Sequence, residues 1–174
     1  MKEKISEKNK DYTKDHTEYQ VREKESRRPD IATDAIIEYD SGSNTGIILI
    51  ERKYFPKKIA LPGGMAEYGI SLPDNVKKEC KEETGLEVKI LDEGQPFMVN
   101  SRPDRDPRGH IISIAYIVKG YGEIKPDEKE DAKRAWLCGI EELKEMFDKD
   151  IFAFDHEHII KEYMVYKGYM KKWK

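Results

Sequence analysis

The sequence predicts an α/β protein in which helices cover both faces of a β-sheet. Segments with the apolar character of strands recur along the chain from about residue 29 onward. One segment with helical character, residues 71–84, lies between these strands, and two more, residues 140–147 and 156–170, follow them. Strands and helices that alternate in this way indicate a sheet whose apolar side chains are buried under a helical layer on each face.

Five segments are predicted to be strands because they are rich in β-branched or aromatic residues and are bounded by turn residues. These segments are residues 31–39, 46–52, 86–91, 109–118 and 132–137. The first two are joined by the turn sequence Asp40-Ser-Gly-Ser-Asn44, so the second strand should return along the first.

The helix over residues 71–84 has sequence signals at both ends. Ser71 can cap its N-terminus together with Asp74, and Pro73 is tolerated in a first turn that needs no internal N–H donor. Gly85 is predicted to end the helix in the left-handed conformation.

The last helix should begin at the run Asp155-His156-Glu157-His158. These residue types can bind metals, but adjacent positions on a helix do not share a face. We therefore expect Asp155 to cap the helix rather than to bind a metal. Its apolar stripe is formed by Ile159, Ile160, Tyr163, Met164 and Val165.

Length and composition predict one folded domain. At 174 residues the chain is long enough for one sizeable core and too short for two ordinary domains. Its first residues are nearly all charged or polar, which divides it into an arm over residues 1–28 and a domain over residues 29–174. The arm is either mobile or docked on the domain or on a second subunit, so a homodimer is one of the alternatives.

Charge, hydropathy and cysteine content exclude several classes of protein. A formal net charge of −3 with 39% charged residues gives surfaces of mixed sign, so we expect no nucleic-acid binding. No apolar run is long enough to span a membrane, and MKEKISEKNK lacks the apolar centre of a secretory signal. Cys80 and Cys138 are too few for a disulfide framework and fall at apolar positions, so a reducing cytoplasm is the expected compartment.

Three acidic residues on the helix over residues 71–84 are the strongest functional signal. Glu79, Glu82 and Glu83 are spaced so that they project from one helical face, where like charges repel. A hard divalent cation with oxygen ligands would remove this repulsion. The preceding Leu61-Pro62-Gly63-Gly64 predicts a tight loop whose glycines let the backbone approach a ligand or metal closely. Loop and helix together should form a cup lined by carboxylates.

The stretch from residue 64 to residue 86 resembles the Nudix box, the loop-helix signature of hydrolases that cleave a nucleoside diphosphate linked to another group. Gly64 matches the opening glycine of this motif, and Glu79, Glu82 and Glu83 match its three core acids. The resemblance implies a Nudix-type α/β/α sandwich with a mixed β-sheet. It also implies that Gly64 and the three acids bind metal and that the acids are catalytic.

Two positions depart from the motif. Ile70 stands where the family has a glutamate, and Lys78 stands where it has an arginine. In the family these two residues commonly form a salt bridge that braces the loop against the helix. Because both ends of this interaction have changed together, we expect activity to survive the change.

The resemblance implies Mg2+ as the cofactor, with Mn2+ as the alternative. Cations held by the acids would neutralise the phosphoryl oxygens and lower the pKa of water. The general base that accepts the proton of this water is either a box glutamate, Glu79 among them, or a glutamate of the segment YGEIKPDEKED. The glutamates of that segment are Glu123, Glu128 and Glu130.

Residues 100–110 predict a stiff loop, because arginines and a histidine are interleaved there with prolines. Arg105 and Arg108 are suited to bidentate contacts with phosphate oxygens or carboxylates. Pro103 and the run from Arg105 to residue 110 resemble the small ADP-ribose pyrophosphatases of the Nudix superfamily. This resemblance implies a small-molecule nucleotide substrate, ADP-ribose or a related nucleoside diphosphate derivative, cleaved to AMP and a sugar phosphate. The alternative is a salt-bridged surface turn.

Arg52, at the end of a predicted strand, is a further candidate for binding a substrate phosphate. The alternative is an ordinary exposed strand end. Tyr54, Phe55 and Phe97 could stack on an adenine, but core or interface packing is the simpler interpretation for each of them.

Two other functions use the same motif. One is a nucleoside triphosphate pyrophosphohydrolase that removes oxidised nucleotides. The other is a non-catalytic Nudix domain that senses ADP-ribose, as in Nudix-type transcriptional regulators, which carry an added winged helix. Only one helical stretch follows the last predicted strands and helix here, which argues against the regulator.

Overall fold

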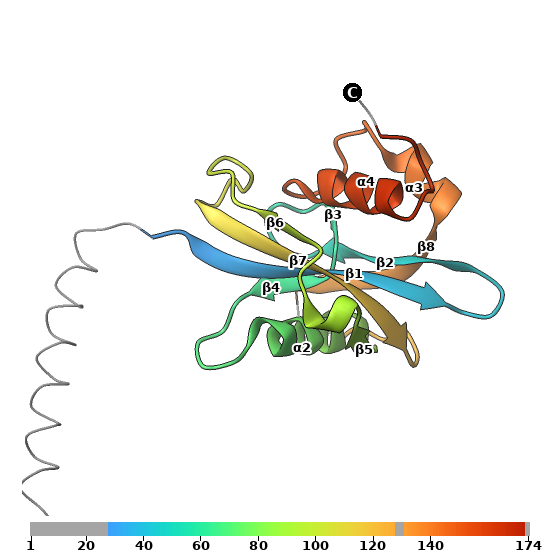
Figure 1. Cartoon of the computed structure of the whole chain (residues 1–174), viewed down its shortest axis with the longest axis horizontal. Helices are drawn as coiled ribbons and strands as arrows, with labels where there is room; N and C mark the ends of the chain where they lie inside the picture. Colours follow the sequence, from blue (N-terminus) through green and yellow to red (C-terminus); the bar gives the residue numbers. More distant parts are fainter. Residues whose placement is uncertain (1–27, 128–130, 173–174) are drawn as a thin grey trace, which may run out of the picture.

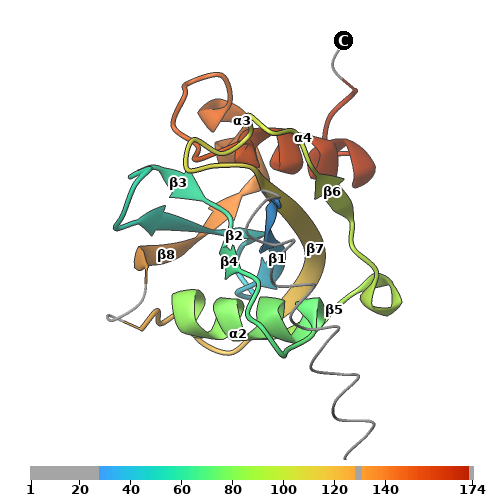
Figure 2. The same cartoon turned by 90° about the vertical axis from the view of Figure 1, so that its left-hand side faces the viewer.

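The computed structural model of the protein describes residues 28–127 and 131–172. Within them, an eight-stranded sheet lies between helix α2 on one face and helices α3 and α4 on the other (Figures 1 and 2). The strands are β1 (Asp30–Asp40), β2 (Thr45–Arg52), β3 (Ile59–Ala60), β4 (Gly63–Met65), β5 (Glu87–Ile90), β6 (Met98–Asn100), β7 (Ile111–Tyr121) and β8 (Ala132–Gly139). The helices are α2 (Leu72–Thr84), α3 (Ile140–Met146) and α4 (His156–Tyr166), with a short 3-10 helix at Asp92–Gly94.

The sheet is mixed, and β1 is at its centre. β1 pairs in parallel with β7 and antiparallel with β2 and β4. The register with β4 sets Thr33 opposite Gly64 and Asp34 opposite Gly63. The glycines that precede the acidic helix are therefore fixed against the central strand.

The core forms two layers because neighbouring residues of β1 point to opposite faces of the sheet. Ile36 packs into the cluster under α3 and α4, whereas Ile37 packs into the cluster under α2. Cys80 and Cys138 are both buried and carry free thiols, as their apolar positions predict.

Most predicted elements are confirmed within one to four residues at their ends, and the helical cover on both faces is confirmed. The strands β3, β4 and β6 were not predicted, because they have only two or three residues and carry no pattern of their own. The expectation of a loop at residues 61–64 is wrong for Gly63 and Gly64, which belong to β4. Glycine allows this pairing, since a Cβ on Gly63 would lie 2.2 Å from the Thr33 carbonyl oxygen.

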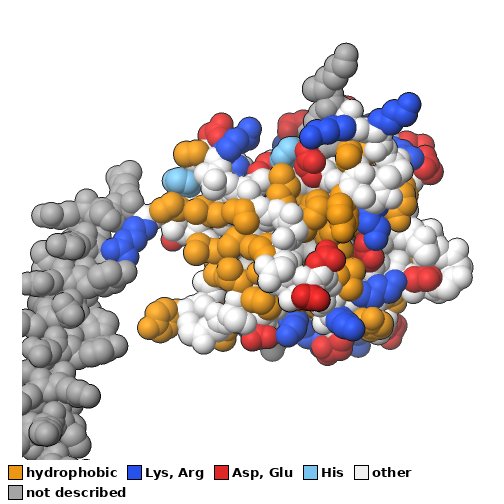
Figure 3. All heavy atoms as spheres, in the orientation of Figure 1, with side chains coloured by type: hydrophobic (Ala, Val, Ile, Leu, Met, Phe, Trp, Pro, Cys, Tyr) orange, Lys and Arg blue, Asp and Glu red, His pale blue; other side chains and the backbone are white. Residues whose placement is uncertain are grey.

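The predicted arm, apart from Arg28, lies outside the described residues. Within the described part of the chain, no helix has the length and apolar character needed to cross a membrane. Acidic and basic side chains are interspersed on the face shown in Figure 3, in agreement with the mixed charge of the sequence.

Candidate active site

Helix α2 is fixed at both ends by the residues that the sequence indicated. The Ser71 hydroxyl accepts a hydrogen bond from the Asp74 backbone N–H at 3.3 Å. Gly85 adopts a left-handed conformation with φ of 79°, and its N–H donates to the Lys81 carbonyl oxygen at 2.9 Å. A side chain at Gly85 would also collide with the backbone of Lys125. These ends determine which helical positions face the loop before α2.

Glu83 is the buried acid of the three, with 2% of its surface exposed. Its carboxylate accepts a hydrogen bond from the Gly63 N–H at 2.8 Å. Burial raises the pKa of Glu83 to about 8, and the charge of Glu79 adds to this, whereas the Gly63 N–H and the Arg52 guanidinium oppose it. The ionised form of Glu83 is therefore short of positive charge in the metal-free protein.

Glu79 and Gly64 fit closely together. A Cβ on Gly64 would lie 2.6 Å from the carboxylate carbon of Glu79, so any larger residue would displace that carboxylate. A shallow groove contains both residues together with Glu82, Glu83 and Asp131.

The groove has the chemistry expected of a site for a hard divalent cation. Its donors are carboxylates and main-chain carbonyls, the oxygen ligands that Mg2+ and Mn2+ prefer. A cation there would stabilise the ionised form of buried Glu83. Among the described residues, no three His, Cys, Asp or Glu side chains already converge on one point as ligands. The lining therefore fits a hard divalent cation in its chemistry, although its carboxylates are not gathered as a preformed ligand cluster in the described part of the chain.

A pH dependence follows from the raised pKa of Glu83. Its ordinary value of 4.5 rises to about 8 in the folded state, so its contribution to stability is present below pH 4.5 and is lost as the pH rises through 8. We expect the melting temperature of the metal-free protein to fall over this range, and to fall less in Glu83→Gln. Thermal melts in chelator at several pH values measure the difference. Parallel curves for the two proteins would show that Glu83 ionises normally.

An arginine-lined cavity adjoins the groove. It shares Gly63, Gly64, Met65 and Asp131 with the groove, and its wall also contains Arg52, Arg105, Asp106, Arg108 and Phe154. The acids and the arginines, far apart in the sequence, therefore line two adjoining hollows that have four lining residues in common.

The guanidinium groups of Arg52 and Arg108 both lie beside the ring of Phe154. Their central carbons lie 5.2 Å and 4.6 Å from the centre of that ring. Arg52 is 7% exposed, and within residues 28–127 and 131–172 no hydrogen-bond acceptor contacts its Nε. Burial and the charge of Arg108 lower the pKa of Arg52. An anion in the cavity would supply negative charge beside these two guanidinium groups.

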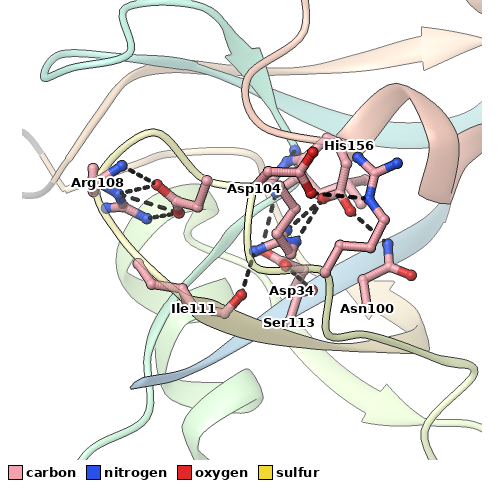
Figure 4. Close-up of polar contacts among 12 residues, drawn as sticks. Asp34, Asn100, Asp104, Arg108, Ile111, Ser113 and His156 are labelled. Atoms are coloured by element: carbon pink, nitrogen blue, oxygen red, sulfur yellow. Dashed lines mark hydrogen bonds and ion pairs between the residues drawn. The ribbon is translucent and has the colours of Figure 1, made fainter. Parts of the chain in front are cut away.

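Arg108 is held by its own loop. Its Nε and Nη2 donate to the two oxygens of Asp106 at 3.0 and 2.8 Å, as Figure 4 shows on the left. This carboxylate fixes the orientation of the guanidinium group at the cavity wall.

Arg105 makes different contacts. Its Nε and Nη2 donate to the same oxygen of Asp155 at 2.9 and 2.5 Å, and Nη1 lies 3.4 Å from the carbonyl oxygen of Ile111. Asn100 donates to the other oxygen of Asp155 at 2.8 Å. Arg105 lines the cavity, but its donors hold the loop of residues 101–110 against the start of α4.

The run from Asp155 to residue 158 begins α4, as predicted, but Asp155 makes no capping hydrogen bond through its side chain. Its carboxylate binds Arg105 and Asn100 instead. The carboxylate oxygens that would cap the helix are thus used by Arg105 and Asn100, which lie far from Asp155 in the sequence.

His156 was not predicted to take part in the site. It is buried, its Nδ1 accepts a hydrogen bond from the Leu61 N–H at 2.9 Å, and its Nε2 lies 3.4 Å from Asp34 (Figure 4). Ser113 donates to the other oxygen of Asp34. This network holds the chain that leads into Gly63, and no local pattern could have revealed it, because Leu61 and His156 alone are 95 residues apart.

The other sequence candidates lie in various places. Tyr54 and Phe55 are exposed on the segment between β2 and β3, whereas Phe97 packs against Tyr166 with ring centres 5.5 Å apart. Glu123 lines a neighbouring cleft with Lys81, and this cleft shares Glu82 with the groove. Glu128 and Glu130 lie outside the described residues. Asp131, which was not a candidate, lines both the groove and the cavity.

The two departures from the motif also differ from one another. Ile70 is 41% exposed. Lys78 forms an ion pair with Glu67 in the loop and lies 3.6 Å from Glu82. The motif's glutamate and arginine are therefore both replaced, as the sequence indicates, but Lys78 still pairs with an acid of the loop, Glu67.

A mixed sheet between helical layers, with a glycine-led acidic helix on one face (Figures 1 and 2), defines the Nudix class of hydrolases. The NUDIX domain family matches residues 28–163, and the chain belongs to this family.

Individual members of the family are also similar to this chain. Over 143 residues the chain is 44% identical to the ADP-ribose pyrophosphatase of Methanocaldococcus jannaschii, covering 80% of this chain and 76% of that protein. A MutT/nudix family protein from Enterococcus faecalis is 26% identical, with a TM-score of 0.63. That match covers 80% of this chain but only 63% of the E. faecalis chain. The NUDIX domain of Shewanella oneidensis NrtR, solved in complex with ADP ribose, shares the fold, with a TM-score of 0.69, 19% identity and coverage of 87% and 97% of the two chains.

Proposed function

We propose that the protein hydrolyses the diphosphate bond of ADP-ribose, or of a closely related nucleoside diphosphate derivative, to AMP and a sugar phosphate. The observation that carries the proposal is that the carboxylate groove and the arginine cavity adjoin one another and share lining residues. A diphosphate needs positive charge on both of its phosphates, and the two adjoining hollows offer a cation site on one side and guanidinium groups on the other. The similarity to the ADP-ribose pyrophosphatase of M. jannaschii supports the same substrate.

The acidic groove is proposed to hold Mg2+, with Mn2+ as the alternative. Its ligands would be Glu79, Glu82, Glu83 and the main-chain carbonyl of Gly64. When bound, the cation supplies Lewis-acid polarisation of the phosphoryl oxygens and lowers the pKa of water. Ionised Glu83 stays oriented through the Gly63 N–H, and Gly64 leaves room for the Glu79 carboxylate.

The arginine cavity is proposed to bind phosphate oxygens. Arg52 lines the cavity, and Arg108 presents a guanidinium group oriented by Asp106. Arg105 also lines the cavity, but its proposed contribution is to fix the loop through its ion pair with Asp155.

The general base is proposed to be a carboxylate at the groove. Glu79 and Asp131 both line it, whereas Glu123 lines a neighbouring cleft that shares only Glu82 with the groove. Moving the proton of the attacking water to such a carboxylate keeps the phosphoryl oxygens fully ionised toward the cation and the arginines. Because both cysteines are buried free thiols, a reducing cytoplasm is the proposed compartment.

A substrate screen tests the proposal. With magnesium present, kcat/KM for ADP-ribose is expected to exceed that for every nucleoside triphosphate, with AMP as a product. Nucleotide sugars and triphosphates are the competitors, and released AMP and pyrophosphate are measured. Faster release of pyrophosphate from a triphosphate would support a nucleotide-cleaning enzyme. Binding of ADP-ribose without any release of AMP would indicate a sensing domain.

A further inference from the structure

Lys78 lies between two acids of different kinds. Its ammonium pairs with Glu67, in the loop before α2, and its Nζ is 3.6 Å from Oε2 of Glu82, one of the proposed cation ligands. All three side chains are partly exposed at the edge of the groove. The lysine can therefore shift toward either acid, and a cation that binds Glu82 must compete with it.

Glu67 is held in place by α2 itself. Its backbone N–H donates to Oδ1 of Asn75 at 3.1 Å. Asn75 is 1% exposed, and its amide donates to Thr33 at 2.9 Å and to the Met65 carbonyl oxygen at 3.3 Å. Asn75 and Lys78 are three positions apart on one helical face, so α2 holds both the main chain and the side chain of Glu67.

The ion pair between Glu67 and Lys78 is too weak to contribute much to folding stability. A partly exposed ion pair adds little to folding stability, because water screens it. The hydrogen bond with Glu67 raises the pKa of Lys78, so the lysine stays charged. The contact therefore acts chiefly by deciding which acid receives the ammonium group.

We propose that Glu67 is a positioning residue that holds the Lys78 ammonium toward the loop and so keeps Glu82 available to a divalent cation. This inference rests on the proposed role of the groove as a magnesium site. In this chain Glu67 lies three residues before Ile70, the position at which the motif has its glutamate. The acid that pairs with Lys78 therefore reaches it from a different point of the loop than the motif glutamate would.

Magnesium titration of the full chain, followed by the melting temperature without substrate, tests the inference. Glu67→Gln is expected to raise the half-saturating magnesium concentration about two- to fivefold, the range expected for a partly exposed charge pair. Its kcat at saturating magnesium should match that of the parent. Glu87→Gln is the matched control, because Glu87 pairs with Lys81 of the same helix at 2.9 Å without lining the groove. This control should titrate like the parent.

The Lys78→Met background separates the proposed route from a direct effect of the Glu67 charge. Lys78→Met is expected to lower the half-saturating concentration, and adding Glu67→Gln to it should change nothing further. An effect of Glu67→Gln that persists without the lysine would overturn the inference. So would a Glu67→Gln protein that titrates like the parent, or a parent that magnesium does not stabilise.

The magnesium titration and the substrate screen can fail independently of one another. Coupling between Glu67 and Lys78 in a protein that does not cleave ADP-ribose would support the inference and contradict the substrate. Cleavage of ADP-ribose with no such coupling would do the reverse.

Discussion

Glu82→Gln and Glu83→Gln are each expected to lower kcat/KM for ADP-ribose by about a thousandfold while the fold is retained. Each substitution keeps the shape of the side chain and removes a carboxylate from the proposed cation site. Loss of several kcal/mol of metal-derived stabilisation of the transition state corresponds to this factor, at about 1.4 kcal/mol for each tenfold. The amide oxygen introduced by Glu83→Gln can still accept the Gly63 N–H, so the loop should keep its position.

Thermal melts with and without magnesium complete this test. Magnesium should raise the melting temperature of the parent by mass action, and it should raise that of either variant less. Glu87→Gln serves as control, because it removes an exposed acid that does not line the groove. Equal magnesium-induced shifts in the parent and both variants would mean that the cation binds elsewhere.

The arginines are expected to separate into two kinds. Arg108→Ala and Arg52→Met should each lower kcat/KM for ADP-ribose by one to two orders of magnitude, as expected when a charge-assisted contact worth about 1.5–3 kcal/mol is lost. Arg52→Met should cost little stability, because it removes a buried guanidinium whose Nε has no hydrogen-bond partner in the described structure.

Arg105→Ala should instead destabilise the protein by about 3 kcal/mol, because it leaves the nearly buried carboxylate of Asp155 without its ionic partner. Urea unfolding and steady-state kinetics on the same three variants measure both effects. If Arg105→Ala stays as stable as the parent and loses only activity, Arg105 contacts the substrate directly. If Arg52→Met and Arg108→Ala keep full activity, the cavity does not bind the phosphates.

Local signals in the sequence account for the part of the site that was predicted. Ser71, Pro73 and Gly85 define helix α2 through interactions within a few residues, and the spacing of the acids follows from the helical repeat. The same is true of the hairpin between β1 and β2. These elements could be predicted because their stabilising contacts are close in the chain.

The remaining features depend on contacts that only the folded chain creates. His156 meets Leu61 across 95 residues, and Arg105 meets Asp155 across 50. Residue type alone marked Arg105 as a phosphate ligand, because a guanidinium group suits a phosphate and a carboxylate equally well. Which of the two it meets is decided by how α4 packs beside the loop, and no local pattern records that packing.

The pairing of β4 with β1 has a consequence for how the two charged regions act on one substrate. Gly63 and Gly64 line both regions, and each packs so closely on its neighbours that a Cβ would strike Thr33 at Gly63 or Glu79 at Gly64. On the proposed function, a diphosphate lies across these glycines with one phosphate toward the cation and the other toward the arginines. The bond to be broken then lies next to main chain that carries no side chains, and any larger residue at Gly63 or Gly64 would have to displace Thr33 or Glu79 before the substrate could take this position.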